Sequence, residues 1–345
     1  MPPTEGQLDA FVAAMARGFS EAAALSSGPV VRHLNLAGHP IRLRCAGAAL
    51  AQHFEPALNH ALQELHASAA PPAVLTIDCW DRAATGVAPP PPPWGEDSFC
   101  RSGAIRGQAQ GRLRITYDRW IRLLSVYDRQ QARVFIQAAS ALELPAWMRR
   151  SPLRPVIGWW AADHGMALLH AGAVATADGA VALAGSSGSG KSTTTLTALA
   201  AGLGFLGDDA CMVRFDPSPT AYPVFGLAKL EPDAFARLTA VQHLAIEIEP
   251  GQNVLNPAAG LVRSAPLKSV ALLEISGQTR TIVEPISSGQ ALRALVEGSL
   301  QEGGGTTLAG LRRLVTEVPC RRLRLGTDPS GVIAAVQRLA QGVSP

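Results

Sequence analysis

Residues 185–192 read GSSGSGKS, which fits the pattern G-x-x-x-x-G-K-[ST] of a glycine-rich loop that binds phosphate. The apolar run VALA at 181–184 precedes this loop, and the segment 193–201 has the pattern of a helix. Backbone N–H groups of such a loop turn inward around an anion, and the following helix directs its positive end at the same point. The stretch therefore predicts a strand, a phosphate-binding loop and a helix in direct succession.

The residue types in the loop each have a physical role in this interpretation. Gly185, Gly188 and Gly190 can adopt backbone angles that other residues resist. The Lys191 ammonium can reach the β- and γ-phosphates, and the Ser192 hydroxyl can ligate Mg²⁺. The loop by itself does not distinguish an ATPase, a GTPase, a transporter motor or a kinase.

Two consecutive carboxylates, Asp208 and Asp209, follow a short apolar stretch, and Asp208 lies 17 residues after Lys191. One carboxylate can hold Mg²⁺, and the other can accept a proton from an attacking hydroxyl. Gly-Asp-Asp is also favourable turn chemistry, but the phosphate loop upstream favours the catalytic interpretation. His170 lies among apolar residues, where it is either a hydrogen-bonded core histidine or a partner that tunes the pKa of the base.

The order LHAGAVA at 169–175, then GSSGSGKS, then GDD at 207–209 resembles the catalytic domain of the HPr kinase/phosphorylase family. Relatives of that family include serine kinases encoded with peptide-modification genes, such as lasso-peptide kinases. The close resemblance covers about residues 165–215, and a looser one extends to the C-terminus. It implies an α/β fold like phosphoenolpyruvate carboxykinase, in which the P-loop kinase domain has a mixed sheet. It also implies transfer of the ATP γ-phosphoryl group to a serine-type hydroxyl.

The resemblance also implies roles for individual residues. Lys191 is catalytic and holds phosphate, Asp208 is the general base, and His170 supports Asp208. Ser192 and Asp209 serve the metal, so the implied cofactors are ATP and Mg²⁺. The residues that it places at the nucleotide are Gly185, Ser187, Gly188, Ser189, Gly190, Lys191, Ser192 and Thr193. Lys229 and Lys268 are either further phosphate contacts or lysines that extend to solvent.

The chain departs from the family in two ways. The Glu-Val-Arg-Gly-type signature tied to phosphorylase activity is missing, and residues 1–150 do not resemble the family's N-terminal domain. The expected acceptor is therefore a hydroxyl on a peptide, on a protein other than HPr, or on a small molecule such as free serine. A non-catalytic, nucleotide-gated binding module is the alternative from another class. The resemblance favours a homo-oligomer, because HPr kinases are oligomers, but no feature of this sequence specifies one.

The organisation of the chain changes near residue 150. Residues 1–150 are predicted to be a smaller α+β domain for acceptor recognition or assembly, and residues 151–345 the catalytic domain. Helical spacing starts after the capping-box pair Thr4 and Gln7. Further expected elements are a hairpin of 31–36 and 41–45, a helix over 47–67, strands over 73–80, 112–117, 120–127 and 133–138, a helix over 155–163, and strands over 166–176 and 180–184.

Composition excludes several classes of protein. The hydrophobic fraction is 47% and the net charge is +3, which argues against disorder of the whole chain and against a nucleic-acid partner. No apolar run reaches the ~18 residues of a membrane helix, so membrane insertion is not expected. The five cysteines are scattered without a C-x-x-C pair, which favours a reduced, cytoplasmic protein.

Overall fold

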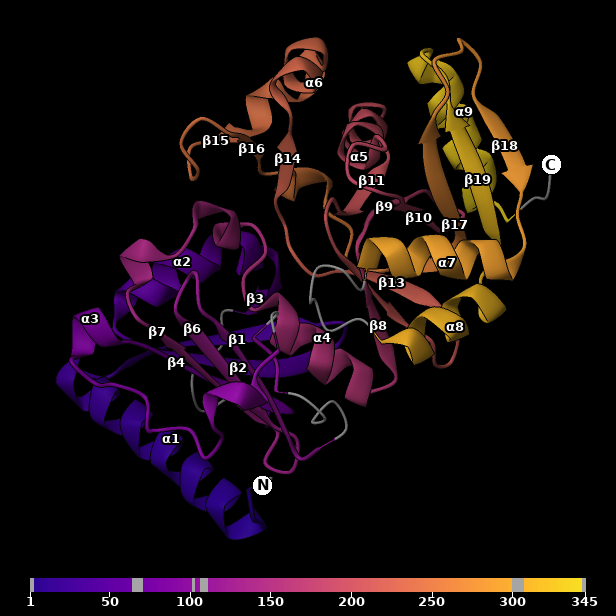
Figure 1. Cartoon of the computed structure of the whole chain (residues 1–345). Coiled ribbons are helices and arrows are strands. Elements are labelled where there is room, and N and C mark those ends of the chain that lie inside the picture. The colour runs from indigo at the N-terminus through magenta and orange to yellow at the C-terminus, as the bar shows by residue number, and fades with distance from the viewer. Residues whose placement is uncertain (1–2, 64–70, 101–102, 106–110, 300–306, 343–345) are drawn as a thin grey trace. The chain divides into compact units, whose positions relative to one another are not determined.

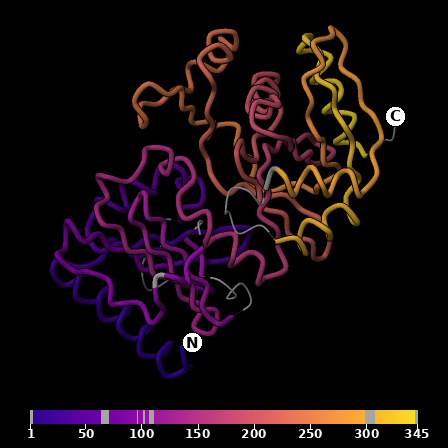
Figure 2. The backbone as a smooth tube through the Cα atoms, viewed as in Figure 1, coloured from indigo at the N-terminus to yellow at the C-terminus, as the bar shows by residue number. Residues whose placement is uncertain are grey.

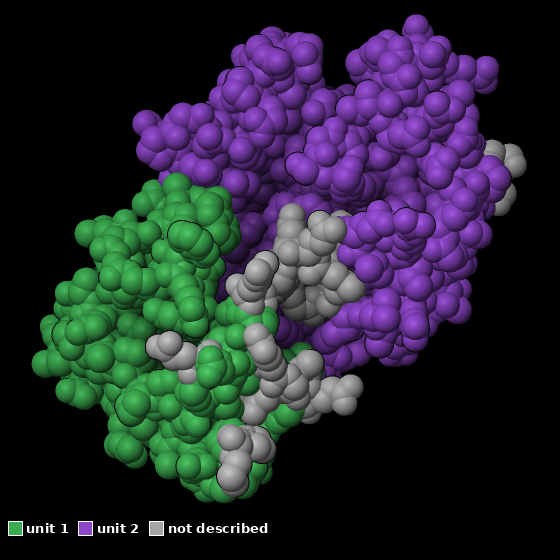
Figure 3. Space-filling model, in the orientation of Figure 1, with its two compact units in different colours: residues 1–56, 61–149 green, residues 57–60, 150–345 purple. Residues whose placement is uncertain are grey.

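The computed structural model describes residues 3–63, 71–100, 103–105, 111–299 and 307–342 (Figure 2). The chain forms two compact units (Figure 3). Unit 1 consists of Met1–Pro56 and Ala61–Arg149, and unit 2 consists of Ala57–His60 and Arg150–Pro345. No helix among the described residues is long and apolar enough to cross a membrane.

Unit 1 is a seven-stranded sheet in the order β3-β1-β2-β4-β7-β6-β5, with helix α1 packed on it (Figure 1). Strands β2, β4 and β7 run parallel and the other pairs are antiparallel. The strands are β1 Pro29–Leu36, β2 His39–Ala46, β3 Leu62–Gln63, β4 Leu75–Asp81, β5 Leu113–Asp118, β6 Leu123–Asp128 and β7 Arg133–Ala138. The helices are α1 Glu5–Leu25, α2 Ala48–Leu58 and α3 Arg82–Thr85, with short 3-10 turns at Asn59–Ala61, Glu96–Ser98, Ala141–Glu143 and Ala146–Arg149.

Local sequence explains most of these elements. The capping box before α1 is confirmed, because the Thr4 hydroxyl accepts the Gln7 N–H at 3.3 Å and the Gln7 side chain accepts the Thr4 N–H at 2.8 Å. The helix expected over 47–67 is shorter, because α2 gives way to a 3-10 turn at Asn59; residues 64–67 lie outside the described residues. The strand expected from 120 begins at Leu123, because the Asp118 carboxylate accepts the N–H groups of Trp120 and Ile121 and forms a turn there.

Unit 2 is built on a nine-stranded mixed sheet, so the mixed α/β fold predicted from the sequence is confirmed. The main order is β11-β9-β10-β17-β13-β12-β8, and β19 lies between β17 and β18. A small sheet β14-β16-β15 stands beside it. The strands are β8 Met166–Leu169, β9 Ala171–Ala175, β10 Ala180–Ala184, β11 Gly204–Gly207, β12 Cys211–Arg214, β13 Thr220–Pro223, β14 Ala228–Leu230, β15 Ala245–Ile246, β16 Asn253–Leu255, β17 Ala265–Ile275, β18 Ile282–Pro285 and β19 Cys320–Leu325. The helices are α4 Arg154–Asp163, α5 Lys191–Ala200, α6 Pro232–Arg237, α7 Ser288–Ser299, α8 Leu308–Glu317 and α9 Pro329–Ala340, with 3-10 turns at Thr239–Leu244 and Ala258–Gly260.

Helices cover both faces of the central strands of this sheet (Figure 1). On β10, Val181 and Leu183 point to α5 and α9, whereas Ala180, Ala182 and Ala184 point to α7 and α8. This alternation is the two-residue period of a strand buried on both sides. Strands β10, β17 and β19 run parallel, and β11 runs in the same direction because both β10 and β11 are antiparallel to β9. The carboxyl ends of all four strands therefore meet at one edge of the sheet.

The single strand predicted over 166–176 is wrong. The chain breaks at His170: β8 pairs with β12, whereas β9 pairs with β10 and β11. An unbroken apolar run does not reveal a change of partner strand, because every residue of β8 and β9 is buried. The break places His170 at the edge where β10 and β11 end.

Candidate active site

The predicted phosphate loop connects the end of β10 to the start of α5. Gly185 has φ 153° and a Cβ there would lie 2.5 Å from the Ser189 hydroxyl. Gly190 has φ 96° and a Cβ there would lie 2.8 Å from Leu325 Cδ1. Only glycine fits both positions, so the loop sequence specifies a narrow backbone turn that ends at the helix N-terminus.

Lys191 folds back over this loop. Its ammonium donates to the carbonyl oxygens of Gly185 at 2.8 Å and Ser186 at 3.0 Å, and the residue is buried. Of the other predicted nucleotide contacts, Ser187, Gly188 and Thr193 are exposed, Ser192 is half-buried and Ser189 is buried. The structure thus brings a cation, N–H groups and hydroxyls together at the start of α5.

Asp208 follows β11 and is buried beside this helix start. Its Oδ2 accepts the Lys229 backbone N–H at 3.0 Å. Its Oδ1 accepts no well-formed hydrogen bond from the described residues, although the Ser192 hydroxyl is near enough to lower the pKa. Burial dominates and raises the pKa of Asp208 to about 6. A buried carboxylate oxygen without a donor costs free energy, which is typical of a group that serves a ligand.

Asp209 has a different environment and is the more accessible of the two, with 36% of its side chain exposed. Its Oδ2 accepts from Arg154 at 2.5 Å and from the Ser151 hydroxyl at 3.2 Å. Its Oδ1 lies 3.3 Å from His170 Nδ1. Burial would raise the pKa of Asp209, but the charges of Arg154 and His170 outweigh it and hold the pKa below its usual value.

The predicted residues Lys191, Ser192, Asp208, Asp209 and His170 therefore lie at one end of one sheet. The pairing differs from the expectation, because His170 lies against Asp209 rather than Asp208. The Ser192 hydroxyl lies instead near Asp208, where it lowers the pKa of that carboxyl. Neighbouring residues after a strand point to opposite sides, and spacing in the sequence does not say which side each takes.

Arg154 contributes to the site but could not be found from the sequence. Arg154 begins α4 and its guanidinium contacts both Asp209 and, at 3.1 Å, His170 Nδ1. No sequence motif marks an arginine at this position. Of the two lysines singled out in the sequence, Lys229 donates its backbone N–H to Asp208, while its ammonium pairs with the exposed Glu231 at 3.3 Å. Lys268 lies beside Gly179, at the opposite end of β10 from the loop.

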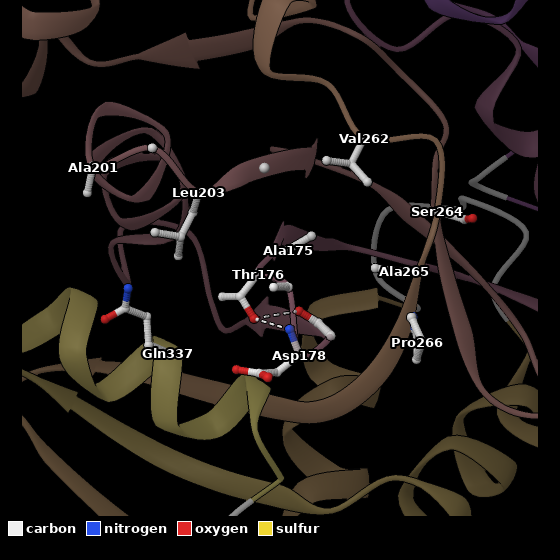
Figure 4. A pocket seen from close by; sticks show the side chains of 14 residues that line it. Ala175, Thr176, Asp178, Ala201, Leu203, Val262, Ser264, Ala265, Pro266 and Gln337 are labelled. Atoms are coloured by element: carbon white, nitrogen blue, oxygen red, sulfur yellow. Dashed lines mark hydrogen bonds between the residues drawn. The ribbon is translucent and has the colours of Figure 1, made fainter.

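A separate cavity of about 570 Å³ lies at that opposite end (Figure 4). It is bounded by the β9–β10 turn, the start of β11 and Gln337 of α9. The Thr176 hydroxyl in its wall donates to the Gly179 carbonyl at 3.3 Å and accepts the Asp178 N–H at 3.1 Å, as Figure 4 shows. These contacts belong to the hairpin turn, and the cavity is not part of the candidate active site.

Comparisons with known proteins give distant likenesses among solved structures. No family model and no curated protein matches the chain. Among solved structures, the chain is similar to one described as the Hpr(Ser) kinase/phosphatase from Coxiella burnetii, with 10% identity and a TM-score of 0.26. The match covers 50% of this chain and 96% of that one.

Proposed function

We propose that unit 2 is an ATP- and Mg²⁺-dependent phosphotransferase with a phosphoenolpyruvate-carboxykinase-like arrangement of its P-loop. It would transfer the γ-phosphoryl group to a serine-type hydroxyl of a peptide or protein. The observation that carries the proposal is the meeting of a phosphate loop with two unlike carboxylates at one edge of the sheet. Asp208 is buried with an unsatisfied oxygen, and Asp209 is accessible and paired with cations.

The residues present fit a magnesium ion. Mg²⁺ prefers oxygen ligands and is commonly bound by one or two carboxylates together with substrate phosphates. Asp208 has a buried acceptor oxygen to offer and lies beside the Ser192 hydroxyl. Both oxygens of Asp209 already contact donors or cations. We therefore assign the metal to Ser192 and Asp208, which reverses the division implied by the family resemblance.

Of the two carboxylates, the accessible Asp209 is the better candidate to contact the acceptor hydroxyl. A hydroxyl from outside can approach Asp209, whereas Asp208 is only 4% exposed. Asp209 would orient the hydroxyl and take its proton at the carboxylate, with Arg154 and His170 fixing the carboxylate plane. Phosphoryl transfer asks little of a base, so orientation is the main contribution of Asp209.

The phosphate loop would stabilise the transferring group. Its N–H groups and the Lys191 ammonium, released from the carbonyls of Gly185 and Ser186, would face the charge that develops on the phosphoryl oxygens. When bound, Mg²⁺ neutralises charge on the β- and γ-phosphates. Unit 1 would recognise the acceptor or mediate assembly.

The test is transfer of label from γ-labelled ATP in the presence of Mg²⁺. Acceptors are serine-containing peptides, proteins of a lysate and free serine, and the variants are Lys191→Ala, Asp208→Asn and Asp209→Asn. We expect label on a peptide or protein with wild type and at least a hundredfold loss with Lys191→Ala. Asp208→Asn should weaken binding of Mg·ATP, whereas Asp209→Asn should bind Mg·ATP normally and transfer slowly.

Other outcomes would replace the proposal. Label on free serine alone would identify a small-molecule kinase. Tight ATP binding without transfer, equal in wild type and Asp209→Asn, would identify a nucleotide-gated binding module. If Asp209→Asn rather than Asp208→Asn weakened Mg·ATP binding, the division of roles between the two carboxylates would be the reverse of the one proposed.

A further inference from the structure

An exposed apolar side chain lies beside the phosphate loop, on the side away from the carboxylates. Ile275 ends β17 and is 63% exposed, and Leu325 ends the neighbouring β19 in register with it. A Cβ placed on Gly190 would lie 2.8 Å from Leu325 Cδ1 and 3.9 Å from Ile275 Cγ1. Both side chains therefore lie next to Gly190, the residue that directly precedes α5. We call this pair the apolar ledge.

Ile275 continues a buried row of side chains beyond the helices that cover it, and Leu325 beside it belongs to that row, being only 8% exposed. Leu273 and Ile275 are two residues apart and share a face of β17, as Leu323 and Leu325 do on β19. That face packs on α5 and α9, and Leu273 is buried there. Ile275 lies one step further along the strand and is left exposed, at the edge of the sheet where the phosphate loop begins.

The backbone around the ledge is fixed. The turn 276–281, which follows Ile275, is hydrogen-bonded to residues 325–328, which follow β19. The Leu325 carbonyl accepts from the Ser276 hydroxyl at 2.7 Å and from its N–H at 3.1 Å. Further bonds run from the N–H of Gly326 to the Thr281 hydroxyl, of Thr327 to the Gln278 carbonyl and of Asp328 to the Thr279 carbonyl. A surface ordered before binding loses little entropy when a ligand arrives.

The loop thus lies between two unlike surfaces. Strand β11, with the carboxylates after it, is on one side of β10, and β17 and β19, with the apolar ledge, are on the other. A nucleotide also has two unlike ends, a charged terminal phosphate at one and a flat, largely apolar base at the other. We infer that Ile275, packed beside the largely buried Leu325, binds the base and ribose of the nucleotide whose phosphates are held by residues 185–192. This inference rests on the proposed function and adds where the nucleoside lies.

The experiment compares a ligand that has a base with one that lacks it. Binding of ATP and of inorganic tripolyphosphate, both with Mg²⁺, is measured by calorimetry for wild type, Ile275→Ala and Ile282→Ala. Ile282 is the matched control: it is also an exposed isoleucine, at 40%, but it pairs with Arg324 and faces the other side of the sheet. We expect Ile275→Ala to weaken ATP binding about tenfold and to leave tripolyphosphate binding within twofold. Ile282→Ala should change neither.

The two ligands separate failure of this inference from failure of the proposed function. If Ile275→Ala leaves ATP binding unchanged, or weakens ATP and tripolyphosphate equally, the base does not lie on the ledge while the phosphate site stands. If wild type binds neither ligand, the proposed function fails and the ledge loses its basis. Because Ile275 is exposed, its truncation leaves the core intact, which the melting temperature of the variant checks.

Discussion

Each unit of the protein has a buried carboxylate on or just after a strand, Asp78 within β4 and Asp208 after β11, but only Asp78 is fully paired. In unit 1, Asp78 is completely buried and accepts four hydrogen bonds of 2.6–2.8 Å, two from Arg44 and two from Arg133. In unit 2, Asp208 accepts one bond from a backbone N–H and keeps Oδ1 unsatisfied among the described residues. A buried charge that stabilises a fold is matched by the fold, whereas one reserved for a ligand is not.

Neutralising the matched carboxylate should have the largest effect. Asp78→Asn removes the charge that two guanidinium groups surround, so we expect unit 1 to lose about 3–5 kcal/mol of unfolding free energy. Hydrogen exchange of peptides from β2, β4 and β7 measures the loss within unit 1. Glu143→Gln, in the exposed pair with Arg122, is the control and should change stability by less than about 1 kcal/mol. If the two substitutions lowered the unfolding free energy equally, burial would not be what makes the Asp78 charge important for stability.

Neutralising the unmatched carboxylate should act in the opposite direction. The pKa of Asp208 is raised from 3.8 to about 6, so above pH 6 the ionised form weakens the fold by roughly 3 kcal/mol. Asp208→Asn should therefore stabilise ligand-free protein at pH 8 by up to that amount. The advantage should shrink as pH falls from 6 to 4, because wild type then takes up the proton itself. Thermal melts across that range measure it.

The adjacent residue is the control for this prediction. Because the pKa of Asp209 is lowered, its ionised form stabilises the fold, and Asp209→Asn should lower the melting temperature at pH 8. Two neighbouring Asp→Asn changes would thus have opposite signs. If both destabilise unit 2, then Asp208 is matched by a donor after all, and its contrast with Asp78 disappears.

The contrast between Asp208 and Asp209 marks the limit of what the sequence predicts. The loop and helix start at 185–192 could be predicted because glycine positions, Lys191 and the flanking strand are local features. The presence of two carboxylates after β11 could be predicted as well. Which carboxylate is buried depends on β14, whose Lys229 N–H contacts Asp208, and on α4, whose Arg154 reaches Asp209. Both contacts join segments about 20 to 55 residues apart, and no spacing rule encodes them.

Arg154 offers a sharper test of the site. Its guanidinium group donates to Asp209 and contacts His170. Arg154→Gln should therefore reduce the rate of phosphoryl transfer at saturating substrate about tenfold, which corresponds to roughly 1.4 kcal/mol of activation free energy. Affinity for Mg·ATP should be unchanged, because Asp208 and Ser192 are not contacted. Arg154→Lys keeps the charge without the planar fork and should lie between wild type and Arg154→Gln. A loss of nucleotide affinity with an unchanged transfer rate would contradict this positioning role.

The smallest effect is expected where charges are matched but exposed. On the face of β17, β19 and β18 that points away from α5 and α9, Arg322 and Arg324 lie 3.6–3.9 Å from Glu274 and Glu284, and all four side chains are between 34% and 51% exposed. Solvent already stabilises these charges, so Arg322→Ala should cost less than about 1 kcal/mol, and the cost should fall further in 1 M salt. A double-mutant cycle with Glu274→Ala measures the pair itself. A cost above 2 kcal/mol that persists in salt would mean that this face is covered by another molecule in solution. These four charged side chains would then resemble Asp78, because burial rather than pairing decides how much a charge contributes to stability.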